Sequence, residues 1–218
     1  MRVVVFGATG AAGRGVLEAC LAAPEVEQVI AVVRRSTALA HAKLRESIWT
    51  KFDDLAGLEP ELVGVDASFY CLGVASAGVS EADYRVVTFD YALAAAKALH
   101  AASPGAAFHF ISGQGTSATS RFMWARVKGE TELALGQLGL ARVTCWRPGY
   151  IHPVVPRENG SFGDRVARAL YPVLRGFAGM SVEAFAIGEA MLEAQRIGRV
   201  GIVENREIRA LAAAHRAH

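Results

Sequence analysis

The sequence has few of the residues that build disulfide frameworks, metal centres or basic surfaces. Only three cysteines occur, at positions 20, 71 and 145, and this wide spacing fits neither a disulfide framework nor a zinc site. Free thiols persist in reducing compartments, so we expect a cytoplasmic protein. The formal net charge is only +2, with Lys and Arg scattered along the chain. A nucleic-acid-binding face needs clustered basic residues, so that class of protein is not expected.

Long apolar runs are also missing. No stretch of 18 or more consecutive apolar residues occurs, so the sequence predicts no transmembrane helix. Glycines interrupt the apolar N-terminus within ten residues, and we expect a buried strand and turn there instead of a signal peptide. Hydrophobic residues nevertheless make up 52% of the 218 residues. That length and composition predict one folded domain with a sizeable core.

Short apolar runs alternate with longer helical patterns through the first 150 residues. Six runs are predicted to be strands, the third of them weakly: residues 2–7, 28–35, 47–52, 67–73, 107–113 and 141–149. Helical patterns are clearest at 13–23, 83–102 and 121–138. Strict alternation of this kind predicts an α/β fold, with a Rossmann-like, doubly wound and mostly parallel sheet.

The alternation becomes irregular after Pro148, where Gly and Pro are scattered through residues 149–180. A helix is predicted at 182–197 and a short strand at 198–205, with a final helix after them. We therefore expect residues 1–218 to form a single domain, in which 149–218 make a small C-terminal cap over the edge of the sheet.

A glycine-rich loop, FGATGAAGRG, joins the first strand to the first helix. It places Gly7, Gly10 and Gly13 at three-residue spacing. The first glycine permits a tight turn, the second lets a pyrophosphate approach the backbone, and the third lets the helix pack closely on the strand. Phosphate oxygens then meet unpaired N–H groups at the helix N-terminus. The sequence thus predicts dinucleotide binding by the residues Gly7, Ala8, Thr9, Gly10, Ala11, Ala12 and Gly13.

The end of the second strand indicates which dinucleotide is bound. An NAD site usually places Asp or Glu there, to bind the ribose 2′-hydroxyl. Here the sequence VVRRS places Arg34 and Arg35 at that point, with no acid. Guanidinium groups match the oxygens of a 2′-phosphate, so we favour NADP(H) over NAD(H). Arg14, directly after the last glycine, is a further candidate contact. The alternative is that the arginine pair is simply solvated.

The glycine spacing in GATGAAG resembles that of the extended and atypical short-chain dehydrogenase/reductase superfamily. The stretches FYCLGVASAG, DYRVVTFDYALAAAKALHAA, RVKGETELAL and WRPGYI resemble one small atypical branch. That branch includes Tat-interacting-protein-like oxidoreductases and short bacterial epimerase/dehydratase-like proteins. The resemblance implies an NADP(H)-binding Rossmann fold with a reduced substrate region, and it implies no particular substrate.

The resemblance also implies contacts on the adenosine side of the cofactor. An aspartate after the third strand would bind the adenine amino group, and KFDDL offers Asp53 or Asp54 for that role. The alternative is that this acid caps the start of the following helix. Cys71, Leu72 and Gly73 would line the ribose and pyrophosphate edge, Gly73 by close approach of its backbone.

On the nicotinamide side, the resemblance assigns roles to residues that follow the fifth and sixth strands. Ser112 would be the serine of the catalytic region, and Lys128 would bind the nicotinamide ribose hydroxyls. Pro148, Gly149 and Tyr150 would meet the nicotinamide end. Ser112, Lys128 and Tyr150 are accordingly the candidate catalytic residues.

The tyrosine of the Tyr-x-x-x-Lys motif is missing. Trp124 stands four residues before Lys128, and Gly113 follows Ser112 where the family carries a second serine. In the parent chemistry a tyrosine hydroxyl exchanges a proton with the substrate oxygen, and an indole N–H does not ionise in a useful range. Tyr150 is an alternative proton donor, or else only an apolar wall with a polar tip.

Two functions remain open at this point. The first is an NADP(H)-dependent oxidoreductase or epimerase-like enzyme that acts on a small carbonyl or hydroxyl compound. The second is a non-catalytic NADP(H)-binding sensor or regulator whose affinity for a protein partner depends on bound NADP(H). In the superfamily, two helices next to the fifth strand often form a dimer face, so a homodimer is a further expectation by analogy.

Overall fold

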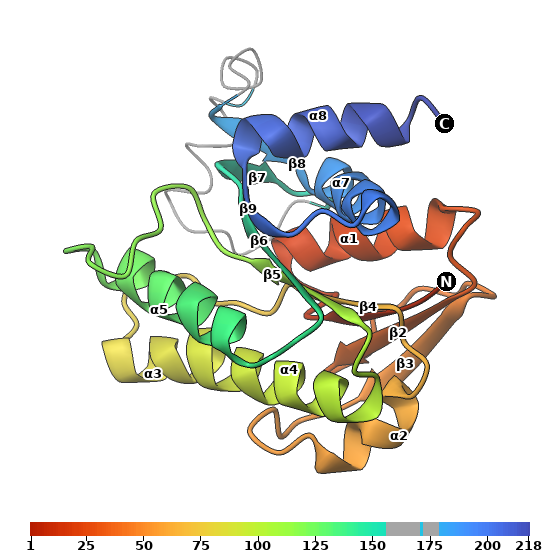
Figure 1. The fold of residues 1–218 in the computed structure, drawn as a ribbon, viewed down its shortest axis with the longest axis horizontal. Helices are drawn as coiled ribbons and strands as arrows, with labels where there is room; N and C mark the ends of the chain where they lie inside the picture. Colours follow the sequence, from red (N-terminus) through yellow and green to blue (C-terminus); the bar gives the residue numbers. More distant parts are fainter. Residues whose placement is uncertain (156–170, 172–178) are drawn as a thin grey trace.

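A single parallel sheet forms the centre of this computed structural model, which describes residues 1–155, 171 and 179–218. Seven strands pair in the order β3-β2-β1-β4-β5-β6-β9 and all neighbours are parallel (Figure 1). Their bounds are β1 Arg2–Phe6, β2 Gln28–Val33, β3 Leu44–Ile48, β4 Ala67–Tyr70, β5 Ala107–Ile111, β6 Arg142–Arg147 and β9 Gly201–Glu204. This strand order confirms the predicted Rossmann-like α/β fold.

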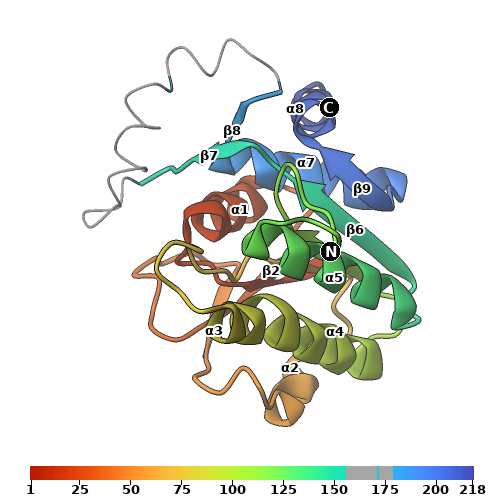
Figure 2. The ribbon, with the colours of Figure 1, turned by 90° about the vertical axis from the view of Figure 1, so that its left-hand side faces the viewer.

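Helices cover both faces of the sheet (Figures 1 and 2). One face carries α1 Ala11–Ala22, α7 Ala184–Ile197 and α8 Asn205–His215. The other carries α2 Glu59–Leu62, α3 Glu81–Arg85, α4 Tyr91–Ala102 and α5 Met123–Gln137. The helix predicted at 83–102 is present, but a π-helical turn at Val86–Asp90 joins α3 to α4.

The apolar runs of the strands are continuous because both faces of the sheet are buried. Successive side chains of a strand point to opposite faces, and they divide the core into two clusters. On β1, Val3 and Val5 belong to the cluster beneath α1 and α7, whereas Val4 and Phe6 belong to the one beneath α4. Trp146 of β6 is fully buried in the first cluster.

The third strand begins and ends earlier than predicted, at Leu44–Ile48 in place of 47–52. It pairs with β2 from Val29 opposite Leu44 onwards. Its register places Arg45 and Glu46 within an edge strand, where one side of the strand is open to solvent. Because the strand contains polar residues, it lacks the continuous apolar run from which the other strands were predicted. The stretch that follows it, starting at Trp49, was included in the predicted strand but forms a loop.

The C-terminal segment differs in part from the expected cap over residues 149–218. β9 pairs with β6 as the last strand of the main sheet, and α7 packs on α1. Two short strands, β7 Tyr150–His152 and β8 Ser181–Glu183, form a separate parallel pair beside α1, α7 and α8. The stretch of scattered Gly and Pro falls largely at 156–170 and 172–178, outside the described residues.

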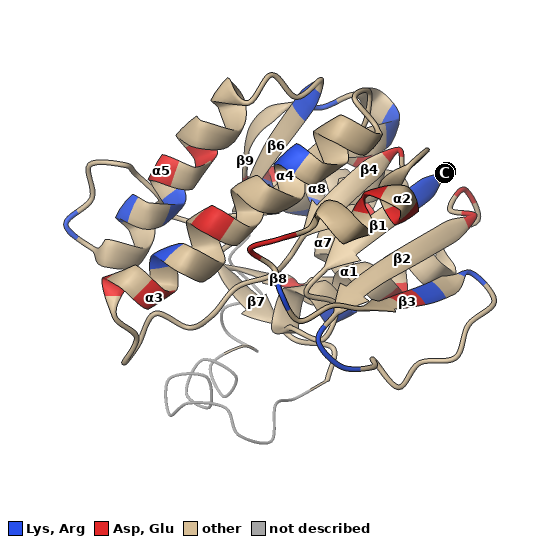
Figure 3. Cartoon of the chain, turned by 90° about the horizontal axis from the view of Figure 1, so that it is seen from below, with Lys and Arg blue, Asp and Glu red and all other residues tan. Residues whose placement is uncertain are grey.

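Charged residues are mixed in sign over the face that α3, α4 and α5 present (Figure 3). Acidic and basic residues both occur on α3 and α5, and α4 carries Lys97, in keeping with a net charge of +2. Within the described residues, no helix combines the length and apolar character needed to cross a membrane. The same part of the chain contains no cluster of three His, Cys, Asp or Glu side chains placed to bind a metal ion.

Candidate functional site

The glycine loop between β1 and α1 is shaped by close backbone contacts. Gly7 has a φ of +76°, and the Gly10 N–H donates to the Gly7 carbonyl oxygen at 2.9 Å. A Cβ on Gly7 would lie 2.7 Å from the backbone of Leu72, and a Cβ on Gly13 would lie 2.1 Å from the Gly7 oxygen. Gly10 precedes α1 in extended conformation, and no side chain caps the helix. The loop therefore needs glycine at positions 7 and 13, and α1 begins with free N–H groups.

A cleft of about 230 Å³ opens above this loop, at the carboxyl ends of β1, β2 and β4. Open α/β sheets bind ligands at this edge. The cleft is lined by Gly7, Thr9, Gly10, Val32, Val33, Arg34, Arg35, Phe52, Cys71, Leu72 and Gly73. The structure thus brings together the predicted residues from three separate loops. Ala8 and Ala12 are buried and do not line the cleft.

Among the described residues that line this cleft, Arg34 and Arg35 are the charged ones. Both are exposed, and neither forms a hydrogen bond or ion pair with any residue that the structure describes. Their donors are therefore available to an anion. On the opposite wall Cys71 is buried, and burial raises the pKa of its thiol far above the usual range, so it stays neutral.

Asp53 and Asp54 do not reach this cleft. They line a separate groove beside α4. The Asp54 carboxylate accepts the Ala56 N–H at 3.2 Å, just before a short 3-10 helix whose N-cap residue is Leu55. Phe52 lines the cleft in their place, and the sequence prediction missed it. The only feature of the sequence that could have pointed to Phe52 is its position directly before the two acids.

Lys128 lies on α5 behind the end of β5. Its Nζ donates to the carbonyl oxygens of Ile111 at 3.1 Å and Ser112 at 2.7 Å. Burial lowers the pKa of Lys128 to about 8, and the Glu132 carboxylate partly opposes this shift. The Ser112 hydroxyl is buried and lies 3.0 Å from the Thr116 hydroxyl, a partner that sequence analysis missed.

Trp124 begins the same helix and its indole lies over the loop that follows β5. A Cβ on Gly113 would be 3.5 Å from Cζ3 of the indole, and a Cβ on Gly115 would be 3.9 Å from Cη2. The ring therefore covers the position where a second serine would follow Ser112. The sequence from Gly113 to Lys128 contains no tyrosine.

The segment after β6 is fixed by Asn205 at the start of α8. The Gly149 N–H donates to the Asn205 side-chain oxygen at 2.8 Å, and a Cβ on Gly149 would lie 2.4 Å from the Met180 carbonyl oxygen. The Pro148 carbonyl accepts the Gln114 N–H at 2.9 Å, which links it to the loop after β5. Pro148 and Gly149 thus lie close to the Ser112 region, and the role of Asn205 was not predicted.

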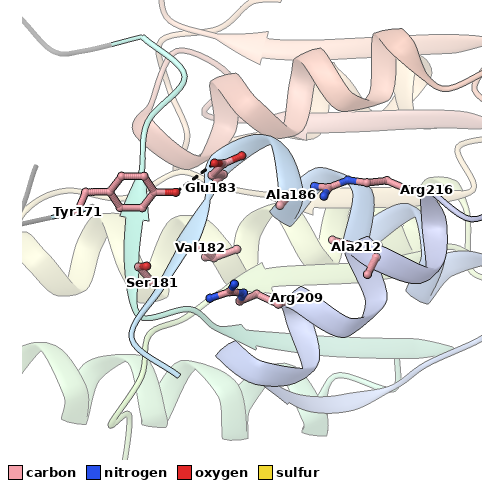
Figure 4. A pocket seen from close by; sticks show the side chains of 9 residues that line it. Tyr171, Ser181, Val182, Glu183, Ala186, Arg209, Ala212 and Arg216 are labelled. Carbon is pink, nitrogen blue, oxygen red and sulfur yellow. Dashed lines mark hydrogen bonds between the residues drawn. The ribbon is translucent and has the colours of Figure 1, made fainter. Parts of the chain in front are cut away.

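Tyr150 belongs to an aromatic group at β7. Its ring centroid is 6.4 Å from that of His152 and 6.4 Å from that of Tyr171. His152 and Tyr171 stack at 3.7 Å, and the Tyr171 hydroxyl donates to Glu183 at 3.1 Å (Figure 4). Tyr171 and Glu183 also border a cavity of about 510 Å³ between β8, α7 and α8, which shares no lining residue with the glycine-loop cleft.

No protein-family model matches the chain. Rat protein HTATIP2 is 26% identical over 94% of this chain and 87% of its own length. The mitochondrial protein FMP52 of Eremothecium gossypii is 28% identical over 97% of both chains. The mitochondrial protein fmp52 of Emericella nidulans is 31% identical over 76% of this chain and 72% of its own.

Solved structures show the same fold. The UDP-glucose 4-epimerase of Thermus thermophilus, in complex with NAD, has a TM-score of 0.69 at 20% identity and covers 99% of this chain and 83% of its own. A short-chain dehydrogenase/reductase from Burkholderia thailandensis has a TM-score of 0.69 at 15% identity, over 92% and 88%. The fmp52 protein of Emericella nidulans shows that the chain belongs to the FMP52 family, and the solved structures show that it has the fold of a short-chain dehydrogenase/reductase.

Proposed function

We propose that this chain binds NADP(H) across the glycine loop at the carboxyl edge of the sheet. The observation that carries the proposal is the cleft in which a glycine loop without room for side chains meets Arg34 and Arg35. The pyrophosphate would lie on the free N–H groups at the start of α1. The UDP-glucose 4-epimerase of Thermus thermophilus, a fold neighbour, was solved in complex with NAD, and this supports the binding of a dinucleotide.

The preference for the 2′-phosphate rests on charge. The cleft is lined by two unpaired guanidinium groups and by no acidic side chain among its described residues. A ribose 2′-hydroxyl would find no carboxylate there, whereas a phosphate would find planar, forked donors. The positively charged guanidinium of Arg14 lies nearby, because it donates to the carbonyl oxygen of Thr37 in the loop after β2.

Parallel titrations with NADPH and NADH test this proposal. The purified chain is titrated with each cofactor by following tryptophan fluorescence. We expect NADPH to bind at least tenfold more tightly. Replacing both arginines (Arg34→Gln with Arg35→Gln) should remove most of that preference, whereas Arg45→Gln on β3, outside the cleft, should leave it intact. Equal binding of the two cofactors would exclude the NADP assignment.

The first candidate activity is hydride transfer between NADP(H) and a small carbonyl or hydroxyl compound. When bound, the cofactor supplies or accepts the hydride. Lys128 would hold the nicotinamide ribose, a role that needs only ammonium donors, and Ser112 and Tyr150 would face the substrate. Without the tyrosine, general acid–base assistance of about 10²–10⁴-fold is lost. Turnover of bound NADPH with a panel of carbonyl compounds measures what remains.

The second candidate function is a non-catalytic sensor of NADP(H). The indole of Trp124 over Gly113 and Gly115 favours it, because an indole there can contact nicotinamide but cannot exchange a proton. The variant Trp124→Tyr separates the two candidates. A gain in NADPH consumption indicates an altered reductase site. An unchanged rate of zero, with cofactor still bound, indicates a sensor.

A cytoplasmic location is part of the same proposal. Cys20, Cys71 and Cys145 are buried free thiols, which suit a reducing compartment. The FMP52 relatives are named as mitochondrial proteins, so cell fractionation with a mitochondrial marker is the informative test.

A further inference from the structure

Arg14 is held between α1 and the loop that follows β2. Its Nε donates to the Glu18 carboxylate at 2.5 Å, one helical turn further along α1. Its Nη1 donates to the Thr37 carbonyl oxygen at 3.2 Å. The third nitrogen, Nη2, donates to no residue that the structure describes. Two hydrogen bonds, from Nε and Nη1, thus fix the orientation of the guanidinium, and the N–H groups of Nη2 remain as donors for a ligand.

The Thr37 side of this arrangement is itself fixed. The Thr37 N–H donates to the Glu46 carboxylate at 2.7 Å, and the Thr37 hydroxyl binds the same oxygen. The hydrogen bond from the Thr37 side chain holds the pKa of Glu46 below its usual value, so this carboxylate is ionised at neutral pH. Glu46 therefore anchors the loop that contains Arg34 and Arg35 and presents the carbonyl that Arg14 contacts.

Arg14 borders a second cavity on the glycine loop. This cavity, of about 220 Å³, is lined by Thr9, Gly10, Ala11, Arg14, Thr37, Pro153 and Val155. It shares Thr9 and Gly10 with the cleft that holds Arg34 and Arg35. The positive charge of Arg14 would therefore attract a phosphate group on the ribose of a dinucleotide in that cleft. Glu18 lines neither cavity, so it does not touch a ligand there, and its contact with the ligand's surroundings is the ion pair with Arg14.

We propose that Glu18 is a specificity-determining residue, which weakens the preference for the 2′-phosphorylated cofactor by partly neutralising Arg14. This inference rests on the proposed binding of NADP(H). The side chains of Arg14 and Glu18 are both 26% exposed, so the pair is only partly screened by water. The Glu18 charge opposes a doubly charged 2′-phosphate and leaves a neutral 2′-hydroxyl unaffected. Glu18 would therefore set the ratio of the two affinities.

The variant Glu18→Gln tests the proposal, because glutamine can still accept the hydrogen bond from Arg14 Nε while the charge is removed. We expect the NADPH dissociation constant to fall about three- to tenfold, and that of NADH to stay the same. Raising the salt concentration should shrink the difference. Glu27→Gln, an exposed residue beyond the end of α1, is the matched charge control and should change neither constant.

A double-mutant cycle makes the test sharper. In an Arg14→Gln background, Glu18→Gln should have a much smaller effect on NADPH, because the guanidinium that Glu18 neutralises is gone. The proposal is overturned if Glu18→Gln weakens NADPH binding, shifts both cofactors equally, or acts as strongly without Arg14 as with it. If the wild-type chain binds neither cofactor or shows no NADPH preference, the proposed function fails as well. If that preference exists and Glu18→Gln leaves it unchanged, only this inference fails.

Discussion

The two halves of the candidate site are built in different ways. On the adenosine side, the glycine loop and the end of β2 offer backbone N–H groups and two arginines without protein partners among the described residues. On the nicotinamide side, Lys128 already donates to two backbone carbonyls, and Trp124 covers the loop after β5. The adenosine half is open and carries two arginine charges, whereas in the nicotinamide half the side chains of Lys128 and Trp124 already contact the protein. The two halves therefore differ in the donors that they leave for a ligand.

The largest effect should come from breaking the adenosine half at Gly13. A Cβ there would lie 2.1 Å from the Gly7 carbonyl oxygen, so Gly13→Val must displace the loop or α1. We expect NADPH binding to weaken by at least about 100-fold and the free energy of unfolding to fall by about 2–4 kcal/mol. Titration and urea unfolding measure both. Gly105→Ala is the control, since a Cβ at Gly105 meets nothing within 4 Å.

Breaking the nicotinamide half at Lys128 should have a smaller effect on binding. Lys128→Met removes the ammonium group and should weaken NADPH about tenfold, by roughly the value of one charge-assisted hydrogen bond. The pKa of Lys128 is about 8, so the ammonium is lost as the pH rises through that value. Wild-type affinity should therefore decline between pH 7 and pH 9, and that of Lys128→Met should not. Identical pH profiles would show that Lys128 does not contact the cofactor.

Beneath the nicotinamide half, His109 of β5 should make the fold sensitive to acid. Burial lowers the pKa of His109 to about 4, and its Nδ1 accepts the Trp146 indole N–H at 3.2 Å. The unfolded chain binds this proton near pH 6.5, so stability is lost as the pH falls from there towards 4. Between pH 7 and pH 5 the wild type should lose about 1–2 kcal/mol more than His109→Gln. His41→Gln, at an exposed position, should behave as the wild type.

The smallest expected effect concerns the Ser112 and Thr116 hydroxyls. Thr116→Val removes one member of this buried pair and should cost about 1 kcal/mol of stability, with little change in NADPH affinity. Thr116→Ser should restore the stability. A large loss of NADPH affinity in Thr116→Val would instead place this hydroxyl in contact with the cofactor.

The sequence pointed to more of the residues that line the glycine-loop cleft than of the contacts around Ser112 and Lys128, and the reason is physical. Glycine spacing and a paired arginine at a strand end are local signals, because backbone geometry at Gly7 and Gly13 dictates the residue type. The strands were predictable for the same reason, since burial on both faces produces continuous apolar runs. The edge strand β3, with Arg45 and Glu46, was predicted weakly and with shifted bounds, and the short strands β7 and β8 were not predicted.

The remaining features depend on contacts between distant segments. Phe52 lines the cleft and Asp54 does not, and the chain turns at Phe52 and Asp53, a turn that the sequence analysis did not predict. Asn205 fixes the loop at Gly149 from 56 residues away, and Thr116 pairs with Ser112 across a turn. Such partners are chosen by tertiary packing, so the sequence alone does not single them out.

Displacement of bound NADPH by adenosine 2′,5′-bisphosphate tests most directly the claim that the adenosine half carries the cofactor. This fragment contains the 2′-phosphate and lacks the nicotinamide. We expect it to displace NADPH with an affinity within about tenfold of the intact cofactor, and to do so far better than adenosine 5′-monophosphate. Failure to displace NADPH, or equal competition by both nucleotides, would contradict the account.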